Sequence, residues 1–517
     1  MLRSSSSRWR KKASSAPPTM SANVRCWSAV PRVRMTEDST RNGARNDAGG
    51  GDRVVTTSSR VTAMIVACAL FMQNLDGTVI ATALPAMARQ FGVPVVHMSM
   101  ALTAYLLSLA VFIPASGWVA DRFGARNVFR AAIGIFTLGS VLCGYSTTLG
   151  MLVASRVLQG LGGAMMVPVG RLVLLRTVPK QQLVNAMAWV TIPALVGPVV
   201  GPPLGGLIVQ YASWPWVFDI NIPVGLLGIV MVTLHVPDVR APDPGPFDAR
   251  GLMLSGGAVA LLMASMETVG RGVVPPWVTL LLAMAGLLCA VVYLGHARGR
   301  QRPVLDPGLL RLPTFRVSVI SGTLFRISAG AFPFLLPLML QVGFEMTPLK
   351  SGAITLASAV GALAMKAVAA RALRQWGFRD TLFWNGIGAA VLVALVAALR
   401  PSWPLVLVYG LLLPAGFLRS LQFTAYNALA YAEVGPARMS AATSLYSTIQ
   451  QLSLTIGVSA GAGALEMAMA IHGRTQPGLA DFSVAFLLIG GIALLAAPTA
   501  LGMARTAGAE MSGAGER

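Results

Sequence analysis

The chain has 517 residues, of which 55% are hydrophobic and 11% charged, and its mean hydropathy is +0.67. This composition excludes a water-soluble globular protein, which could not bury so much apolar surface, and predicts an all-α, polytopic membrane protein. The net charge of +21 does not indicate a nucleic-acid partner, because twelve of the 40 basic residues lie in the first 60 residues and most of the others flank apolar segments on one side.

The two ends of the chain are polar. Residues 1–60 are rich in Ser, Arg, Gly and Pro without an apolar period, which predicts a disordered basic tail. Residues 1–34 hold eight basic residues and no acid, as in a transit peptide, but we favour an extension upstream of a start at Met35. Residues 504–517 are predicted to be a short cytoplasmic tail.

Apolar segments of about 20 residues, each long enough to cross roughly 30 Å of hydrocarbon, recur from Val61 onward. We predict fourteen spans: 61–85, 98–119, 128–147, 149–170, 185–210, 216–236, 252–270, 277–296, 317–342, 351–372, 382–399, 403–424, 440–463 and 482–503. The even number and the distribution of basic residues place both termini in the cytoplasm. The longest polar connections flank the seventh and eighth spans, so we predict a six-helix bundle over 61–236, two inserted helices with linkers over 237–316, and a second six-helix bundle over 317–503.

A very short polar turn, GWVADRFGAR over residues 117–126, joins the second and third spans. Its arginines, Arg122 and Arg126, indicate the cytoplasmic side. Gly117 and Gly124 would let helix backbones approach closely, and Asp121 could meet a helix N-terminus.

This turn resembles the G-x-L-A-D-R-x-G-R signature of major facilitator superfamily transporters. The resemblance implies two six-helix halves that rock about a midplane site, with this turn as a conformational latch.

The first span contains one acid, Asp76, in the stretch LDGTVIATALP over residues 75–85. A charged carboxylate inside a membrane costs a few kcal/mol, which predicts that Asp76 faces a cavity and carries a proton. Alternatively, it bonds to nearby backbone and holds a kink. The stretch resembles the L-D-x-T-I-V-x-x-A-L-P signature of fourteen-helix drug:proton antiporters of the EmrB/QacA type, which implies a coupling role for Asp76.

The fourth span carries Arg156 at a depth similar to that of Asp76, so the two could pair or compete for a proton. Alternatively, Arg156 bonds helix-end carbonyls near the outer interface. The segment RVLQGLGGA resembles the family's R-x-x-Q-G-x-G-A motif, which implies a role for Arg156 in proton transfer. Gln159 would then be a polar neighbour facing the cavity.

The fifth span places Gly197, Gly201 and Gly205 on one helix face, among prolines that bend the helix. Ordinary helix packing is the alternative interpretation. The string GPVVGPPLGG resembles the G-P-x-x-G-P-x-x-G-G antiporter signature, which implies export. The residues that match it are Gly197, Pro198, Gly201, Pro202, Gly205 and Gly206.

Two further acids lie near predicted outer ends. Residues 214–225, WPWVFDINIPVG, resemble the W-R-W-I-F-x-I-N-x-P-x-G element of the fourteen-helix branch, with Asp219 at a position that is usually apolar. We predict that Asp219 is a water-exposed interfacial carboxylate; the alternative is that it contacts substrate at the outer mouth. Glu267 is predicted to reach the outer interface and has no assigned role in transport.

The second half carries three buried cations, Arg326, Lys366 and Arg419, which we predict as substrate-cavity residues. For Lys366 the alternative is that its long stem reaches an interface. Much of 61–465 resembles MdtD-type exporters, including Phe325–Gly330 and the Met365-Lys366 pair, whereas Arg419 falls outside that pattern.

We therefore predict proton-coupled efflux of small amphipathic molecules by alternating access, in a monomer of the bacterial inner membrane. The predicted partners are a small-molecule substrate, protons and the lipid bilayer. No cofactor, metal site or enzymatic activity is expected, because the sequence has no metal spacing, phosphate-binding glycine loop or His-carboxylate cluster. Cations outnumber acids in the predicted cavity, which favours anionic or neutral substrates. The alternatives are proton-coupled uptake, organic-anion transport, or a non-transporting sensor of this fold.

Overall fold

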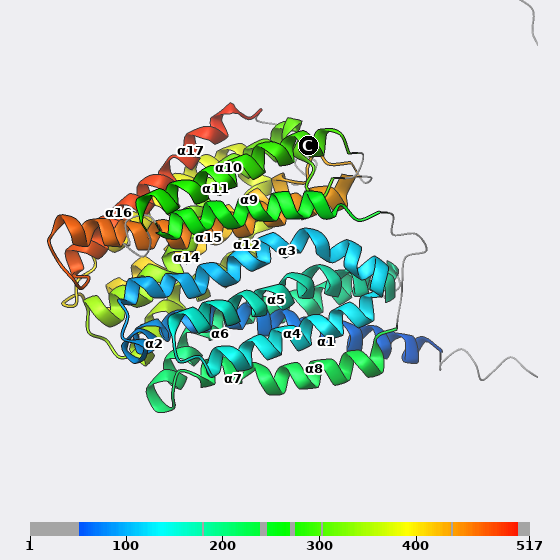
Figure 1. The fold of residues 1–517 in the computed structure, drawn as a ribbon, viewed down its shortest axis with the longest axis horizontal. Coiled ribbons are helices and arrows are strands. Elements are labelled where there is room, and N and C mark those ends of the chain that lie inside the picture. Colours follow the sequence, from blue (N-terminus) through cyan, green and yellow to red (C-terminus); the bar gives the residue numbers. More distant parts are fainter. Residues whose placement is uncertain are drawn as a thin grey trace, which may run out of the picture. The chain divides into compact units, whose positions relative to one another are not determined.

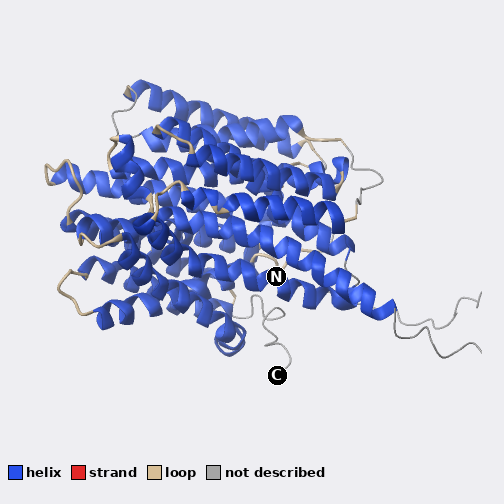
Figure 2. Cartoon of the chain, turned by 90° about the horizontal axis from the view of Figure 1, so that it is seen from below, coloured by secondary structure: helices blue, strands red, loops and turns tan. Residues whose placement is uncertain are grey.

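The computed structural model describes residues 51–177, 180–237, 246–268, 275–300, 303–435 and 438–504. These residues form helices joined by turns, and no strand occurs among them (Figure 2). The prediction of an all-α membrane protein is therefore confirmed. Residues 1–50 of the disordered tail predicted over 1–60 lie outside the described residues, whereas residues 51–60 are helical and form the start of α1 (Gly51–Val79), so the prediction of disorder is wrong for them. Residues 505–517 of the C-terminal tail predicted over 504–517 also lie outside the described residues.

The longer helices of the first part of the chain are α1 (Gly51–Val79), α2 (Leu84–Phe91), α3 (Ser99–Phe123), α4 (Ala125–Gly144), α5 (Leu149–Thr177), α6 (Lys180–Tyr211) and α8 (Asn221–His235). Those of the second part are α9 (Ala249–Thr268), α10 (Pro276–Arg298), α11 (Pro313–Leu338), α12 (Pro348–Asp380), α13 (Gly386–Leu395), α14 (Leu405–Leu429), α15 (Met439–Ile471) and α16 (Leu479–Leu494). Short helices complete the spans: η1 (Ile80–Thr82), η2 (Val95–Met98), α7 (Trp216–Asp219), η4 (Met339–Gly343) and α17 (Ala496–Thr499).

Within the described residues, 13 helical segments are long and apolar enough to cross a membrane. They match thirteen of the fourteen predicted spans, and the 32-residue α6 occupies the place of the remaining one, predicted over 185–210. Several helices run past the predicted limits. For example, the span predicted over 98–119 extends over Val95–Phe123, because apolar patterning records the hydrocarbon-embedded part of a helix and not its polar ends.

Two groups of helices lie side by side, α1–α8 and α11–α17 (Figure 1). Within the first group α5 packs against α3 and α4, and within the second α11 packs against α15 and α12 against α14. Two helix pairs join the groups: α6 packs against α12, and α3 against α15. The proposed partition into two six-helix bundles is compatible with this arrangement.

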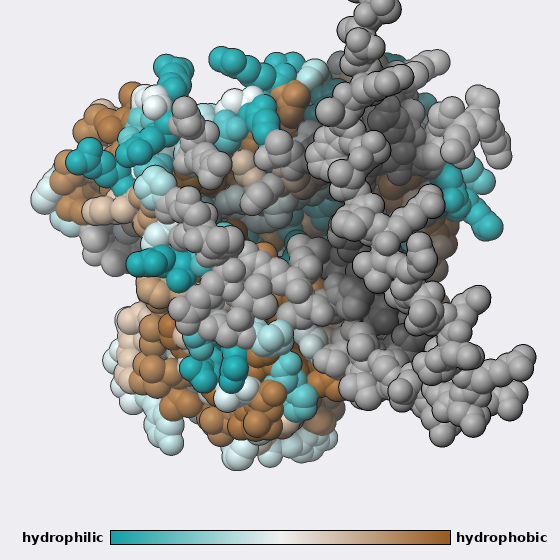
Figure 3. All heavy atoms as spheres, turned by 90° about the vertical axis from the view of Figure 1, so that its right-hand side faces the viewer, coloured by the Kyte–Doolittle hydropathy of each residue, from teal (hydrophilic) through white to brown (hydrophobic). Residues whose placement is uncertain are grey.

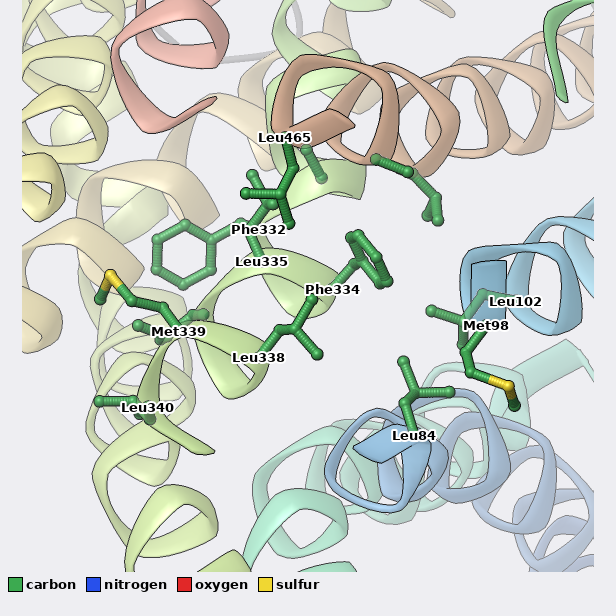
Figure 4. Packing of buried hydrophobic residues seen from close by; sticks show 14 of the residues in the cluster. Leu84, Met98, Leu102, Phe332, Phe334, Leu335, Leu338, Met339, Leu340 and Leu465 are labelled. Carbon is green, nitrogen blue, oxygen red and sulfur yellow. The ribbon is translucent and has the colours of Figure 1, made fainter. Parts of the chain in front are cut away.

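The apolar cores show where the two groups meet. One cluster contains residues of both groups at the end of the bundle where α2 and η2 lie. In Figure 4, Leu84, Met98 and Leu102 of the first group face Phe334 and Leu338 of α11. Toward the other end, where α3 joins α4, each group has its own buried cluster. Among the described residues of these clusters, the groups therefore share a core at the α2 end and not at the other.

The inserted helices differ from each other in their surroundings. Most apolar side chains of α10 are exposed, including Trp277 at 67% and Leu280 at 64%, as expected of a helix that faces lipid. Helix α9 packs against α10 and α3 and also contacts α15, so it touches both groups. The prediction that Glu267 reaches the interface is wrong: its side chain is buried, and Ser459 of α15 donates a hydrogen bond to it. The position of Glu267 near a helix end in the sequence gave no indication that Ser459 of α15 would be its neighbour.

A carboxylate ties the start of α9 to the end of α10. Asp248, just before α9, accepts hydrogen bonds at Oδ1 from the backbone N–H of Gly251, at 3.0 Å, and pairs at 2.7 Å with Nε2 of His296 on α10. Burial acts to raise the pKa of Asp248, but the bonds from His296 and Gly251 outweigh it, and the pKa lies below its ordinary value of 3.8. The charged form is therefore favoured by folding.

We expect Asp248→Asn to lower the thermal stability of the purified protein at pH 5–7. A carboxyl group with a depressed pKa contributes stability above its unfolded-state pKa and loses it as the pH falls through the folded-state value. The stability difference between wild type and variant should therefore narrow as the pH falls below about 4. Melting curves of both proteins from pH 3.5 to 7 measure this stability difference. A stability difference that does not change with pH would contradict this account.

Candidate functional site: a buried ion pair between α1, α5 and the neighbouring helices

Asp76 lies in the last turn of α1, just before the helix breaks into η1 and then α2. Its exposed fraction is 1%, so the structure places it inside the first helix group and not in an open cavity. Pro85 at the start of α2 ends the regular helix here, because proline has no N–H to donate to the preceding turn.

Arg156 of α5 is the charged partner of Asp76. Its Nη1 lies 2.6 Å from Asp76 Oδ2, and neither side chain is exposed to solvent. Arg156 Nε also donates to the backbone carbonyl of Ala101 on α3 at 3.2 Å, and the guanidinium lies 4.5 Å from the centre of the Tyr105 ring. Asp76 and Arg156 form an ion pair, as the first of our two interpretations predicted. The structure does not show the alternatives, in which Asp76 bonds to nearby backbone or Arg156 lies at the outer interface.

Three neutral polar residues complete the site. Gln159 Nε2 donates to Asp76 Oδ1 at 2.8 Å and to Ser140 Oγ at 2.7 Å, while its Oε1 accepts from Arg156 Nη1 at 2.5 Å. Asn221 of α8 donates to Asp76 Oδ1 at 3.0 Å and to Ser140 Oγ at 3.2 Å. Gln159 is thus buried within the network and does not line a cavity in this conformation.

Ser140 and Asn221 are the residues that sequence reasoning missed. Asn221 is the asparagine of the WPWVFDINIPVG stretch, so the motif contained a signal that we did not connect with Asp76. Ser140 on α4 belongs to no motif, and its role depends on how α4 packs against α5: a Cβ at Gly139 would overlap the backbone of Gln159. Only the folded structure brings this hydroxyl to the site.

Both carboxylate oxygens of Asp76 accept hydrogen bonds, and one of the donors is the cationic guanidinium of Arg156. Removing one member of a buried ion pair leaves an uncompensated charge and costs about 3–5 kcal/mol.

The glycines of α6 lie against the opposite side of α1. A Cβ at Gly201 would overlap Thr78 Oγ1, and one at Gly205 would overlap Thr82 Oγ1 and the Val79 carbonyl. At Gly197 the nearest atom, Leu75 N, would lie 3.1 Å away.

Gly206 faces the other helix group. A Cβ there would overlap the Pro348 carbonyl at the start of α12. Pro198 is partly buried and Pro202 is buried, and the backbone of Pro202 meets Gly352 of α12. Helix α6 is thus held between α1 and α12.

The predicted latch turn consists of a single residue outside the helices. Gly124 has φ +89° and lies between the end of α3 at Phe123 and the start of α4 at Ala125, a backbone conformation that favours glycine. Arg126 Nη2 donates to the Thr233 carbonyl of α8 at 2.5 Å, Asp121 is partly exposed and Arg122 is exposed.

Gly117 does not have the close neighbour that we predicted. The residue is exposed, and a Cβ added to it would meet nothing within 4 Å. The expected helix approach at Gly117 is therefore wrong for this conformation, because the two helix groups do not share a core at this end. Figure 3 views the molecule from this end, and hydrophilic side chains cover part of the visible face.

The three predicted cavity cations of the second group are separate from the ion pair. Arg326 is fully buried, donates to Tyr446 Oη and, at 3.4 Å, to Asn427 Oδ1. Arg419 is partly exposed and donates to Ser358 Oγ at 2.9 Å. Lys366 is exposed and donates to Thr424 at 2.8 Å, in agreement with the alternative that its stem reaches an interface. Among the described residues, no group of three His, Cys, Asp or Glu side chains could hold a metal ion.

Comparison with known proteins identifies the family. The profile of the Major Facilitator Superfamily matches residues 66–458. The chain belongs to the major facilitator superfamily. This is a family of membrane transporters, so the prediction of a non-enzymatic membrane protein is confirmed.

The family match extends to named relatives and to solved structures. The chain is 40% identical over 397 residues to the "Putative multidrug resistance protein MdtD" of Klebsiella pneumoniae, covering 76% of this chain and 84% of the relative. Its fold is similar to that of a POT family transporter, with a TM-score of 0.65 at 13% identity over 86% and 95% of the two chains. A bacterial homologue of the human lysosomal transporter Spinster aligns with a TM-score of 0.59 at 16% identity over 86% and 98%. The likeness to MdtD-type proteins predicted from the sequence is confirmed.

Proposed function

We propose that this chain exports small amphipathic molecules in exchange for protons, by alternating access. The observation that carries the proposal is the buried Asp76–Arg156 pair, which places one titratable carboxylate among helices that a transporter of this family must move. A relative named as a multidrug resistance protein, 40% identical over most of its length, supports efflux as the direction and drugs as the cargo.

The proton site is connected to the second helix group through α1 and α6. Protonation of Asp76 weakens its bonds with Arg156 and Asn221, which frees α1 to shift against α5 and α8. The other face of α1 meets the glycines of α6, and α6 in turn meets α12 at Gly206. A shift of α1 is therefore transmitted through rigid backbone contacts, because glycine surfaces leave no flexible side chain to absorb it.

The conformation corresponds to an inward-facing state with the outer side closed, if the arginine-bearing α3–α4 turn is cytoplasmic. Contacts across the outer end include Gln341 Nε2 donating to the Thr82 carbonyl at 3.1 Å and the Leu349 N–H donating to Gln210 at 3.3 Å. His97 Nε2 also lies 3.9 Å from Glu466 of α15. Export then requires this end to open and the α3–α4 end to close, with both termini on the cytoplasmic side.

Proton exchange can be tested in proteoliposomes that enclose a pH-sensitive dye. Addition of a transported compound under a pH gradient should change the internal pH, and the sign of the change distinguishes exchange from co-transport. Alkalinisation of an acid-loaded lumen by a broad panel of amphipathic compounds is the expected result. If compounds cross without any proton movement, the coupling proposal is wrong.

We expect Asp121→Asn to slow turnover several-fold while leaving substrate binding nearly unchanged. Asp121 lies at the end where the two helix groups have separate buried clusters, so its charge can stabilise the opposite facing state without touching substrate. Binding isotherms and transport rates of the same preparation measure the two effects. The matched control is Asp380→Asn, which removes an exposed carboxylate at the end of α12. Equal losses in both variants would reject a specific latch.

A further inference from the structure

The central parts of α11, α12 and α14 carry positive charge without any negative charge. Arg326 lies midway along α11 and Arg419 just past the middle of α14. The sequences of these three helices contain one acid, Asp380, the last residue of α12. The second helix group thus differs from the first, in which Asp76 balances Arg156.

Both arginines have neutral partners only. Arg326 bonds to Tyr446 and Asn427, and its Nε and Nη1 atoms have no hydrogen-bond partner. Arg419 bonds to Ser358, and its guanidinium lies 4.5 Å above the Phe332 ring. No carboxylate of the described residues forms an ion pair with either. A guanidinium cannot lose its charge, so each carries an unbalanced positive charge in a low-dielectric setting.

We propose that this part of the second helix group binds the anionic group of the substrate, with Arg419 as the contact residue. Arg419 is partly exposed and can be reached, whereas the fully buried Arg326 adds to the positive potential of this helix group. The substrate class is an amphipathic organic anion, such as an aromatic carboxylate or sulfonate. This inference rests on the proposed transport function and adds the chemistry of the cargo.

The charge balance gives the physical reason. A bound anion supplies the negative charge that neither arginine has, and an Arg–carboxylate or Arg–sulfonate contact can use two parallel hydrogen bonds. A permanent cation would be repelled by the same field. The ring of the partly exposed Phe423 lies near Arg326 and suits an aromatic body attached to the anionic group, whereas Phe332 under Arg419 is buried.

The test uses three size-matched probes: naphthalene-2-sulfonate, its neutral sulfonamide, and the naphthyl trimethylammonium ion. Calorimetry on the detergent-purified protein measures binding without a proton gradient, and empty micelles correct for partition. We expect the sulfonate to bind best. Arg419→Gln should weaken it at least about ten-fold, Arg419→Lys should recover part of the loss, and sulfonamide binding should change less than about two-fold.

Two further variants sharpen the interpretation. Arg400→Gln removes an exposed cation that bonds only to neighbouring carbonyls, and it should leave sulfonate binding unchanged. Arg326→Gln should weaken sulfonate binding, with a smaller effect on the sulfonamide. A preference for the ammonium probe, unchanged sulfonate binding in Arg419→Gln, or equal loss of all three probes would overturn the proposal.

The binding assay separates this inference from the proposed function. Sulfonate binding that depends on Arg419 supports the anion site even when proteoliposomes show no proton exchange. The lack of proton exchange would then reject only the proposed transport mechanism. Proton exchange driven by the ammonium probe, together with sulfonate binding that does not depend on Arg419, would reject the anion site and retain proton-coupled export.

Discussion

Replacing Asp76 with asparagine should abolish proton-driven efflux while the protein is still expressed and inserted. The amide has the same shape and can remain among Gln159, Asn221 and Ser140, but it cannot bind and release a proton. It also leaves the Arg156 charge unbalanced at the centre of the first helix group, so the conformational equilibrium no longer responds to pH. We expect the rate of transport driven by a pH gradient to fall by about two orders of magnitude or more. A loss of this size is usual when an enzyme loses the side chain that transfers a proton.

Two comparisons make this prediction specific. Asp76→Glu keeps the titratable group and should retain partial activity with a shifted pH profile. Asp219→Asn removes a partly buried carboxylate at the α2 end of the bundle and should transport like the wild type. Active pumping against a concentration gradient by the Asn variant would show that Asp76 has a structural role only. Counterflow, which needs no proton gradient, should survive in Asp76→Asn and would demonstrate that the protein is folded.

The second large effect is expected from a bulky residue on the glycine face of α6. Gly201→Leu places a side chain where Thr78 of α1 already lies. The backbone N of Val79 lies next to Thr78 and leaves little room for adjustment. Overpacking of this kind costs about 1–3 kcal/mol, enough to exclude one of two nearly balanced conformations. We therefore expect transport to fall by at least about ten-fold, with a larger effect on turnover than on the amount of inserted protein.

A graded series distinguishes packing from general damage. Gly197→Ala should be the mildest alanine variant, because its nearest atom would lie 3.1 Å from the new Cβ, whereas Gly201→Ala and Gly205→Ala create overlaps. The matched control is Gly491→Leu, on a helix surface of α16 where a Cβ meets nothing within 4 Å. If Gly201→Leu and Gly491→Leu transport equally well, α6 does not rely on close contact with α1.

The fold class and the positions of the spans were predictable from the amino-acid sequence. Each span must bury about 20 apolar residues in lipid, and this requirement is local, so apolar length predicts a span without knowledge of its neighbours. The cost of charge in a membrane is equally local, which is why Asp76 and Arg156 were predictable as site residues. Helix ends were less accurate, because the hydrogen-bonded backbone continues beyond the apolar stretch.

Which side chains contact each other became clear from the packing of the helices. Ser140 and Asn221 reach Asp76 because α4 and α8 pack beside α5, and nothing in the local sequence around either residue specifies that distance. Glu267 was assigned to an interface from its place near a helix end, but α15 covers it. Gly117 matched a motif yet has an open surface, since its neighbour depends on which end of the bundle is closed. Contacts between helices that are distant in sequence depend on the packed bundle, and so does the facing state. The free energy of packing depends on how two helix surfaces fit together, which no single segment of the sequence specifies.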